Sequence, residues 1–281
     1  MRKVSKAGSC EKLNSQKFAS IVIPTLNEEK GIAKVINEIP KEELEKMGYE
    51  CEILIVDGGS TDRTQEIARK NGAKVVVQPH LGYGRAYKTG FADARGNILV
   101  TLDGDFSYPA FLIPKLVKLL EEQKLDFISA SRINNFAQGN FSMLHLIGNK
   151  ILTYFTRFLF RINVRDSQSG MWVFRESILD KINPSNDGMA FSEEIKVLAF
   201  KLFRSTEVSV PYRKRIGKQK LRTLVDGIEN LTHLFVLRFS LGGFNPPELL
   251  RPPDMRRIDF VVGTNNRNIL LPHLRARHSL L

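Results

Sequence analysis

Cysteine is scarce in this sequence, and long apolar runs are absent. Cys10 and Cys51 are the only cysteines among 281 residues, so we expect no disulfide framework and a reducing compartment. No stretch reaches the roughly 18 uncharged apolar residues that a transmembrane helix needs. Residues 1–17 are basic and polar and lack the apolar centre of a secretory signal. We therefore expect any membrane contact to be peripheral.

Acidic residues are few relative to basic ones. The chain has 42 Lys and Arg against 30 Asp and Glu, which gives a formal net charge of +12. This surplus favours an anionic partner, such as a phosphorylated substrate, an acidic membrane surface or a nucleic acid. The hydrophobic content of 42% is ordinary for a globular chain that can bury a sizeable core.

The order of apolar patterns predicts an α/β domain with a mostly parallel sheet. Short apolar runs predict strands at 18–24, 52–56, 74–77, 97–102 and 126–131. Helical spacing predicts helices at 28–39, 62–71, 83–94 and 109–122. Strands that alternate with helices in this way are typical of right-handed βαβ units.

The pattern changes after Arg132. The stretches 141–162 and 221–239 are apolar and basic and predict amphipathic helices, which either pack on the sheet or lie on lipid headgroups. Between them the pattern predicts a strand at 170–174 and a helix at 191–203. We expect a basic extension at 1–17, one folded domain at 18–240, which would carry any catalytic site, and a poorly structured tail at 241–281.

The most informative segment is Asp103-Gly104-Asp105, which directly follows a buried strand. Two carboxylates at the carboxyl end of a strand lie where open α/β sheets bind ligands. Hard carboxylate oxygens suit Mg²⁺ or Mn²⁺, which proteins commonly share with substrate phosphates. Asp-Gly is also a common turn, so the segment alone does not establish a metal site.

Two other features support a site for a phosphorylated ligand. Asp57 follows four apolar residues and precedes two glycines, a position from which acidic side chains bind a base or ribose in nucleotide sites. A basic run also places six cations within ten positions without an acid: Arg213, Lys214, Arg215, Lys218, Lys220 and Arg222. Such a run is otherwise a solvated or nucleic-acid-binding face, but Tyr212 is its only aromatic neighbour, so we do not expect nucleic acid.

Four motifs in this order resemble glycosyltransferase family 2. They are PTLNEE, VDGGSTDRT, GYGRAYKTGFADARG and TLDGDFSYP, and within the family they resemble dolichyl-phosphate mannose or glucose synthases and their archaeal relatives. The resemblance covers residues 18 to about 239. It implies the A-type glycosyltransferase fold, a Rossmann-like sheet flanked by helices.

The resemblance also implies roles for individual residues. It places Pro24, Leu26, Glu28, Asp57, Asp103 and Gly104 in the nucleotide pocket. It makes Asp103 and Asp105 metal ligands, with Asp105 the direct one, and gives catalytic roles to Asp105, Arg132 and Arg215. The phosphate and acceptor side is implied to contain Arg132, Asp166, Lys214, Arg215 and Lys220. Lys214 replaces Arg215 if the motif is shifted by one residue, and Ser107 stands where the family often has a glutamine ligand.

These observations lead to one expectation and one enzymatic alternative. We expect an inverting, Mg²⁺- or Mn²⁺-dependent transferase on the cytoplasmic membrane face, which moves a hexose from a GDP- or UDP-sugar to dolichyl (polyprenyl) phosphate. A phosphate acceptor is already ionised near neutral pH and needs no general base. The alternative is a hydroxyl acceptor, which needs a base such as Glu193 or Asp166. We expect Glu193 and Glu194 to lie on a solvated helix face and Trp172 to fill the core.

Overall fold

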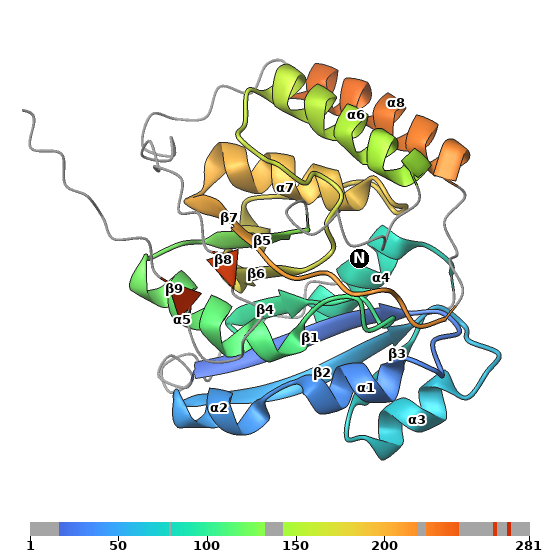
Figure 1. Cartoon of the computed structure of the whole chain (residues 1–281), viewed down its shortest axis with the longest axis vertical. Helices are drawn as coiled ribbons and strands as arrows, with labels where there is room; N and C mark the ends of the chain where they lie inside the picture. Colours follow the sequence, from blue (N-terminus) through green and yellow to red (C-terminus); the bar gives the residue numbers. More distant parts are fainter. Residues whose placement is uncertain are drawn as a thin grey trace, which may run out of the picture.

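Nine strands form one mixed sheet in the computed structural model of the chain, which describes residues 17–78, 80–132, 143–217, 223–241, 261–262 and 269–270. The strands are β1 (Lys17–Thr25), β2 (Tyr49–Asp57), β3 (Lys74–Val77), β4 (Ile98–Thr101), β5 (Phe127–Ser131), β6 (Trp172–Arg175), β7 (Ser205–Ser209), β8 (Val261–Val262) and β9 (Ile269–Leu270). Figure 1 shows them running through the centre of the molecule.

The strand order explains where a ligand can bind. The order is β3-β2-β1-β4-β6-β5-β7-β8-β9. β2 and β3 therefore lie on one side of β1, and β4, the next strand in the sequence, lies on the other side. β1 pairs in parallel with both β2 and β4. In open α/β sheets a crevice forms outside the carboxyl ends of the strands where the order reverses. The fold therefore predicts a site beyond the ends of β1 and β4.

One strand runs against the others in the middle of the sheet. β6 is antiparallel to both of its neighbours, β4 and β5, whereas β5 and β7 are parallel. The segment that leads into β6 consequently reaches the same edge as the carboxyl ends of β4 and β5.

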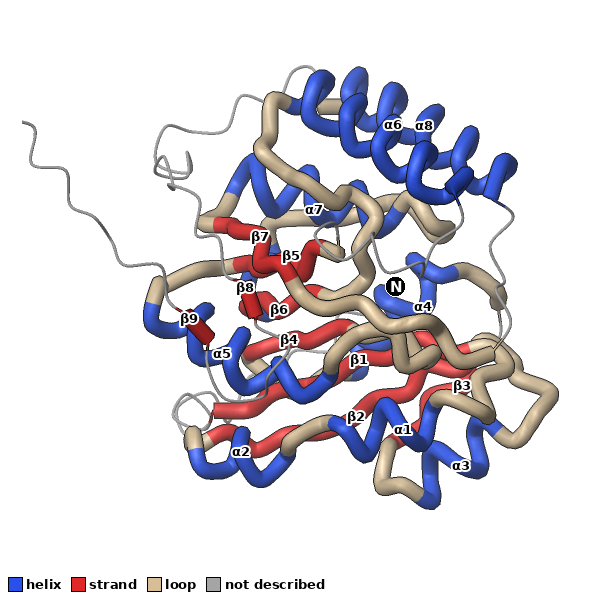
Figure 2. The backbone as a smooth tube through the Cα atoms, in the orientation of Figure 1, coloured by secondary structure: helices blue, strands red, loops and turns tan. Residues whose placement is uncertain are grey.

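Helices cover both faces of the sheet (Figure 2). They are α1 (Ile32–Glu38), α2 (Lys41–Lys46), α3 (Thr64–Lys70), α4 (Tyr83–Asp93), η1 (Ala110–Leu112), α5 (Ile113–Glu122), α6 (Met143–Phe160), η3 (Glu176–Asp180), α7 (Phe191–Leu202) and α8 (Thr223–Ser240). The alternation of side chains along β1 separates the two main cores. Ile21 and Ile23 pack with α1, α2, α3 and α5, and Val22 packs with α4 and α7. A third cluster joins α6, α7 and α8.

Most of the predicted elements are confirmed. The first predicted helix begins at Ile32 rather than at Glu28, because Glu28 to Gly31 form a turn in which Glu28 O accepts from the amides of Gly31 and Ile32. The sequence pattern did not indicate α2 or β7. β7 consists mainly of polar residues that are nevertheless buried, so it lacks the apolar signal of a central strand.

Three further expectations can be compared with the fold. Within the segment predicted as a tail, β8 pairs with β7 and β9 pairs with β8; most of that segment and residues 1–16 lie outside the described residues. Among the described helices, none combines the length and apolar character required to cross a bilayer. Trp172 fills the core as predicted, with its side chain fully buried.

Candidate active site

Asp57 organises the loop that follows β2. Its carboxylate is buried and accepts hydrogen bonds from the amides of Gly59 and Ser60 at 3.1 and 2.8 Å and from Gln65 Nε2 at 2.8 Å. Thr25 Oγ1, at the end of β1, donates to the other carboxylate oxygen at 3.2 Å. Asp57 therefore ties the ends of β1 and β2 together, and its predicted contact with nucleotide remains a prediction.

Two leucines flank a glycine beside this loop. A Cβ atom placed on Gly58 would lie 3.8 Å from Leu81 Cδ2 and 4.0 Å from Leu26 Cδ1. Leu81 is largely exposed, and Leu26 and Pro24 are half-buried. The edge near β1 and β2 thus offers an apolar surface beside backbone polar groups, a combination that suits a nucleobase and its ribose.

Asp103 and Asp105 lie on the turn after β4. Asp105 is almost fully buried and accepts from Ser107 N at 3.0 Å and from Ser107 Oγ at 2.5 Å. Asp103 is half-buried and accepts from Tyr83 Oη at 3.4 Å. Burial and, second, the neighbouring Asp105 raise the pKa of the Asp103 carboxyl, whereas Arg132 and Arg215 oppose this rise.

Glycine at position 104 allows the two aspartates to approach the end of β1. A Cβ atom on Gly104 would lie 3.0 Å from Thr25 Cγ2 and 3.3 Å from Glu28 Cγ. Those contacts are tight, so a side chain at this position would require Thr25 or Glu28 to shift by a few tenths of an ångström. The turn after β4 and the turn that contains Glu28 are therefore packed directly against each other.

The carboxylate pair fits a hard divalent ion. No group of three or more His, Cys, Asp or Glu residues with metal-binding geometry occurs among the described residues. Two carboxylates are nevertheless a common protein share of a Mg²⁺ site, because substrate phosphates and water complete the octahedron. A cation between Asp103 and Asp105 would also relieve their mutual repulsion. Ser107, which stands at the family's glutamine position, donates its hydroxyl to Asp105.

Arg132 and Asp166 form a buried bidentate ion pair next to the aspartates. Arg132 Nε and a terminal guanidinium nitrogen each lie 2.7 Å from an Asp166 carboxylate oxygen, and Arg132 N donates to the same carboxylate at 3.0 Å. Burial alone would raise the pKa of Asp166, but Arg132 holds it below its usual value. The Arg132 guanidinium also lies 5.4 Å from the centre of the Tyr212 ring.

Part of the basic run reaches the site. Arg215 forms an ion pair with Asp105 at 2.8 Å, and its backbone neighbour Ile216 donates an amide to Asp105 O at 2.9 Å. Lys214 is exposed, so of the two alternatives Arg215 is the one that meets the aspartates. Arg213 instead pairs with Glu38 at 2.6 Å and lies 3.9 Å from the centre of the Phe106 ring. Lys218, Lys220 and Arg222 lie outside the described residues.

A buried lysine supports the segment around Asp166 and was not predicted from the sequence. The Lys196 side chain on α7 is 0% exposed. Its ammonium donates to Asp166 O, Ser167 O and Ser169 Oγ at 2.9 to 3.0 Å. From the other side, Glu207 on β7 accepts from the amides of Arg165 and Asp166. The backbone around Asp166 is consequently fixed by one buried cation and one buried carboxylate.

The prediction that Glu193 and Glu194 lie on a solvated helix face is wrong. Both side chains are buried, because α7 is covered by the sheet on one side and by α6 and α8 on the other. Glu194 accepts from the amides of Ser185 and Asn186, and Glu193 accepts from Gln168 Nε2 at 2.7 Å. Burial raises the pKa of Glu193 to about 8. The sequence feature that could have indicated this burial is the adjacent pair Glu193 and Glu194 inside an otherwise apolar helical pattern.

Comparison with known proteins agrees with this geometry. The sequence profile described as Glycosyl transferase family 2 matches residues 20–183. The low-salt glycan biosynthesis hexosyltransferase Agl6 of Haloferax volcanii is 35% identical over 232 residues, which cover 80% of this chain and 56% of that protein. A dolichyl-phosphate hexose transferase of the same organism is 32% identical over 208 residues, covering 74% of this chain and 88% of that protein. This chain thus spans little more than half the length of Agl6.

Solved structures show the same fold at lower sequence identity. Glucosyl-3-phosphoglycerate synthase from Mycobacterium tuberculosis, in complex with Mn²⁺, uridine diphosphate and glucosyl-3-phosphoglycerate, superposes with a TM-score of 0.61 and 20% identity. The superposition covers 83% of this chain and 82% of that chain. Fold, family profile and relatives agree with the sequence motifs: the chain belongs to glycosyltransferase family 2.

Proposed function

We propose that the chain moves a hexose from a nucleotide sugar to a polyprenyl phosphate such as dolichyl phosphate, with inversion at the sugar and with Mg²⁺ or Mn²⁺. One observation carries the proposal: two acidic and two guanidinium side chains meet at one sheet edge. Asp103 and Asp105 contribute the acids, and Arg215 and Arg132 contribute the cations. This arrangement suits a reaction in which both the leaving group and the nucleophile are phosphates.

The donor side is formed by the first half of the chain. We assign the base and ribose to the surface near Pro24, Leu26 and Asp57, and the diphosphate to the turn around Glu28, Gly104 and Asp105. Asp103 and Asp105 would hold the metal ion, which when bound neutralises charge on the diphosphate. The mycobacterial synthase binds uridine diphosphate, which supports a UDP-sugar, whereas a GDP-sugar is the second candidate.

The acceptor side is formed around Arg132. In the proposed reaction an acceptor phosphate oxygen attacks the anomeric carbon, and the bond from that carbon to the diphosphate breaks with its electron pair on the nucleoside diphosphate. Arg132 is already oriented by Asp166, so it can hold the incoming phosphate without a large loss of side-chain entropy. The relative named as a dolichyl-phosphate hexose transferase supports this acceptor class.

The hydroxyl-acceptor alternative lacks an evident base. Asp166 is bound to Arg132 through both carboxylate oxygens, so it is a poor proton acceptor. Glu193 is buried and bonded to Gln168. A phosphate acceptor requires neither residue to take a proton.

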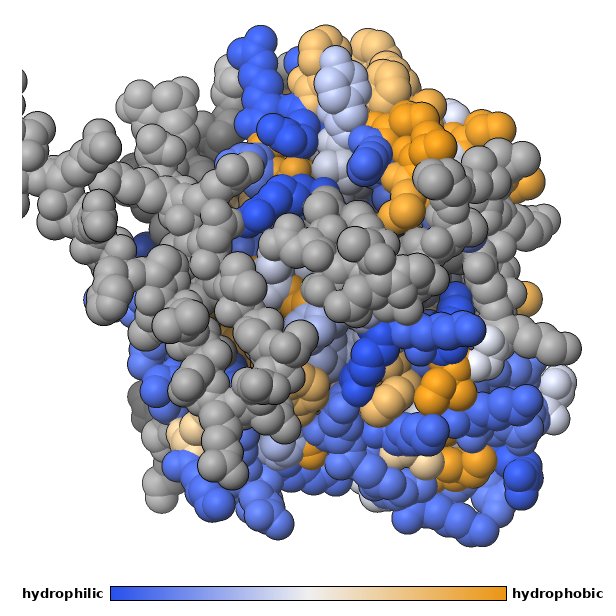
Figure 3. Space-filling view, in the orientation of Figure 1, coloured by the Kyte–Doolittle hydropathy of each residue, from blue (hydrophilic) through white to orange (hydrophobic). Residues whose placement is uncertain are grey.

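A lipid acceptor also requires access to a membrane, and α6 and α8 provide a suitable surface. Figure 3 shows an apolar area over these two helices. Its exposed side chains are Ile147, Ile151, Tyr154, Phe158, Val225, Ile228, Phe235, Val236 and Phe239. We assign this face to the cytoplasmic membrane surface, with the helices lying in the interface.

Two measurements test the function. In a thermal-shift panel of GDP- and UDP-sugars with Mn²⁺ or Mg²⁺, one nucleotide class should raise Tm in a metal-dependent way, and Asp105→Ala should remove that shift while remaining folded. In a transfer assay, labelled sugar should enter the organic phase only when dolichyl phosphate is added. Normal transfer by Asp105→Ala would refute the metal assignment, and a product that stays in water would refute the lipid acceptor.

A further inference from the structure

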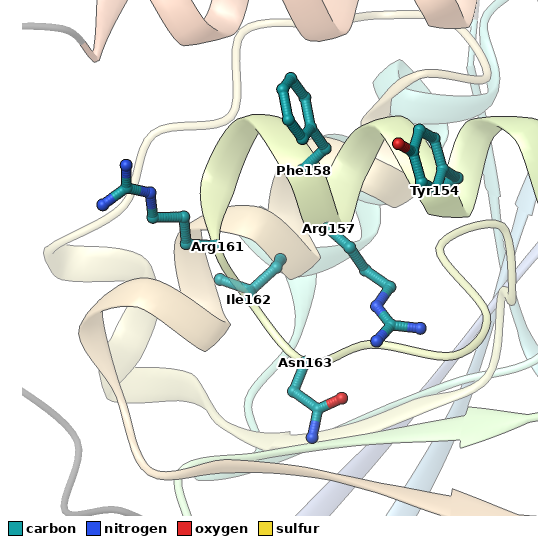
Figure 4. Close-up of a pocket in the computed structure, with 6 residues that line it drawn as sticks. All are labelled: Tyr154, Arg157, Phe158, Arg161, Ile162 and Asn163. Atoms are coloured by element: carbon teal, nitrogen blue, oxygen red, sulfur yellow. The ribbon is translucent and has the colours of Figure 1, made fainter.

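The carboxyl-terminal end of α6 presents two aromatic rings to solvent. Tyr154 and Phe158 are 65% and 68% exposed, and their rings lie nearly parallel at a centroid distance of 6.3 Å. Figure 4 shows both rings on one side of the helix, with Arg157 extending toward Asn163 on the other side. A cavity of about 550 Å³ is formed here by Tyr154, Arg157, Phe158, Arg161, Ile162 and Asn163.

The same end of α6 carries positive charge that no described acid neutralises. Arg157 and Arg161 are exposed, and no ion pair joins either of them to an acid among the described residues. α6 itself contains no Asp or Glu. Burial lowers the pKa of Lys201, and repulsion from Arg238 and Arg161 lowers it further. Lys201 on α7, Arg238 on α8 and Arg161, which directly follows α6, therefore lie near one another.

We propose that this end of α6 is a binding site for the headgroup of an anionic phospholipid. Guanidinium groups bind phosphate oxygens through paired hydrogen bonds, and aromatic rings beside them favour the boundary between headgroups and acyl chains. In this arrangement the Tyr154 and Phe158 rings enter the apolar layer, and Arg157 and Arg161 hold the phosphodiester. Cations near a helix carboxyl end are also stabilised by the helix dipole, but that effect does not account for exposed aromatic rings beside them.

Two other occupants suit the surface less well. A second copy of this chain, bound symmetrically, would bring the same cations against each other. Single-stranded nucleic acid also binds aromatic rings and arginines, but here the rings continue into exposed aliphatic side chains such as Ile151 and Ile147, which a polar backbone would not cover. The inference rests on the proposed membrane acceptor, and it adds a preference for anionic lipid.

Vesicle binding tests the site. The full chain should bind phosphatidylcholine vesicles that contain phosphatidylglycerol at least about tenfold more tightly than pure phosphatidylcholine, since each basic residue near an anionic surface contributes about 1 kcal/mol. The double variant Arg157→Gln/Arg161→Gln should lose about tenfold or more of this preference. Tyr154→Ser/Phe158→Ser should weaken binding to both vesicle types. The charge-matched control Lys46→Gln/Arg69→Gln, on exposed positions of α2 and α3, should bind as the wild type does.

Two results would overturn the site. One is unchanged phosphatidylglycerol preference in Arg157→Gln/Arg161→Gln, and the other is a labelled single-stranded oligonucleotide that displaces the wild-type chain from anionic vesicles. Sugar transfer to detergent-dispersed dolichyl phosphate separates this inference from the proposed function. Arg157→Gln/Arg161→Gln should match the wild type in that assay. If the wild-type chain itself transfers no sugar, the proposed function is refuted, whereas the lipid preference measured with vesicles is unaffected.

Discussion

The Arg215 guanidinium lies 2.8 Å from an Asp105 carboxylate oxygen. The Asp105 side chain is only 4% exposed, so its negative charge is balanced within the protein rather than by solvent. A divalent ion held by the same carboxylate would compete with Arg215 for that oxygen. Arg215 would then be able to turn from Asp105 to a phosphate group, because the backbone of its segment is independently fixed through Ile216 and Arg213.

Competition between Arg215 and a metal ion predicts that a variant without the Arg215 side chain binds metal more tightly. Arg215→Met should bind Mn²⁺ about three- to tenfold more tightly in the absence of substrates, since it removes a competing cation worth about 1 kcal/mol. The same variant should transfer sugar poorly. Isothermal titration with Mn²⁺ measures the affinity, and Lys214→Met, at the exposed neighbouring position, is the control. Weaker Mn²⁺ binding by Arg215→Met would contradict the competition.

Arg132 and Arg213 both bind a carboxylate through two nitrogens, yet we expect different effects from the same substitution. Arg132→Lys keeps the charge but loses the paired geometry, and kcat/KM for the lipid phosphate should fall about 10²-fold. Arg213→Lys should lower Tm through loss of contacts with Glu38 and Phe106, with transfer within a few-fold of wild type. Steady-state kinetics with each substrate varied, together with melting curves, separate these outcomes. Equal losses of transfer in both variants would refute the assignment of Arg132 to the acceptor.

Substitution of Lys196 should lower both the stability of the fold and the affinity for the proposed acceptor. Lys196→Met leaves the carbonyls of Asp166 and Ser167 without their buried donor, at a cost of about 3 kcal/mol or more. We expect a fall in Tm of about 5–10 °C, a higher KM for the acceptor and little change in the KM for the nucleotide sugar. Lys201→Met, on the same helix, should melt close to wild type. An unchanged acceptor KM in a folded Lys196→Met would limit Lys196 to a structural role.

The raised pKa of Glu193 predicts that the free energy of unfolding depends on pH. Its pKa is 4.5 when unperturbed and about 8 in the folded chain, so between these values the folded state holds a proton that the unfolded state has released. The free energy of unfolding therefore falls as pH rises through this window, by roughly 1.4 kcal/mol for each unit of pKa shift. Glu193→Gln resembles the protonated acid and should melt several degrees above wild type at pH 8 and near wild type at pH 4.

The kinetics of Glu193→Gln also distinguish the acceptor classes. Because a phosphate acceptor needs no base, the variant should retain transfer to dolichyl phosphate. A loss of transfer by several orders of magnitude, with the fold intact, would favour the hydroxyl-acceptor alternative.

The first half of the fold, which contains β1 to β4, could be predicted well from the sequence. Each of its strands is a short apolar run that ends in polar residues, as at Val56 to Asp57 and Leu102 to Asp103, so sequence position alone places those side chains at one sheet edge. The four ordered motifs resemble those of glycosyltransferase family 2, and the solved structures support the fold that this resemblance implies.

The second half of the fold was harder to predict because its polar side chains are buried. Glu193 and Lys196 interrupt the otherwise apolar helix α7, and Glu207 lies on the mainly polar strand β7. The bonding partners of all three lie 25 or more positions away in sequence. Local periodicity treats such residues as solvated, whereas the folded arrangement shows that each of them bonds to the segment around Asp166.

The reversed direction of β6 has a consequence for how this enzyme can diversify. It brings the loop before β6 to the edge that also carries the ends of β1 and β4, without altering the register of those strands. Under the proposed function, changes in that loop would alter which acceptor is recognised while nucleotide recognition is inherited intact, so the two substrate preferences could evolve as separate traits.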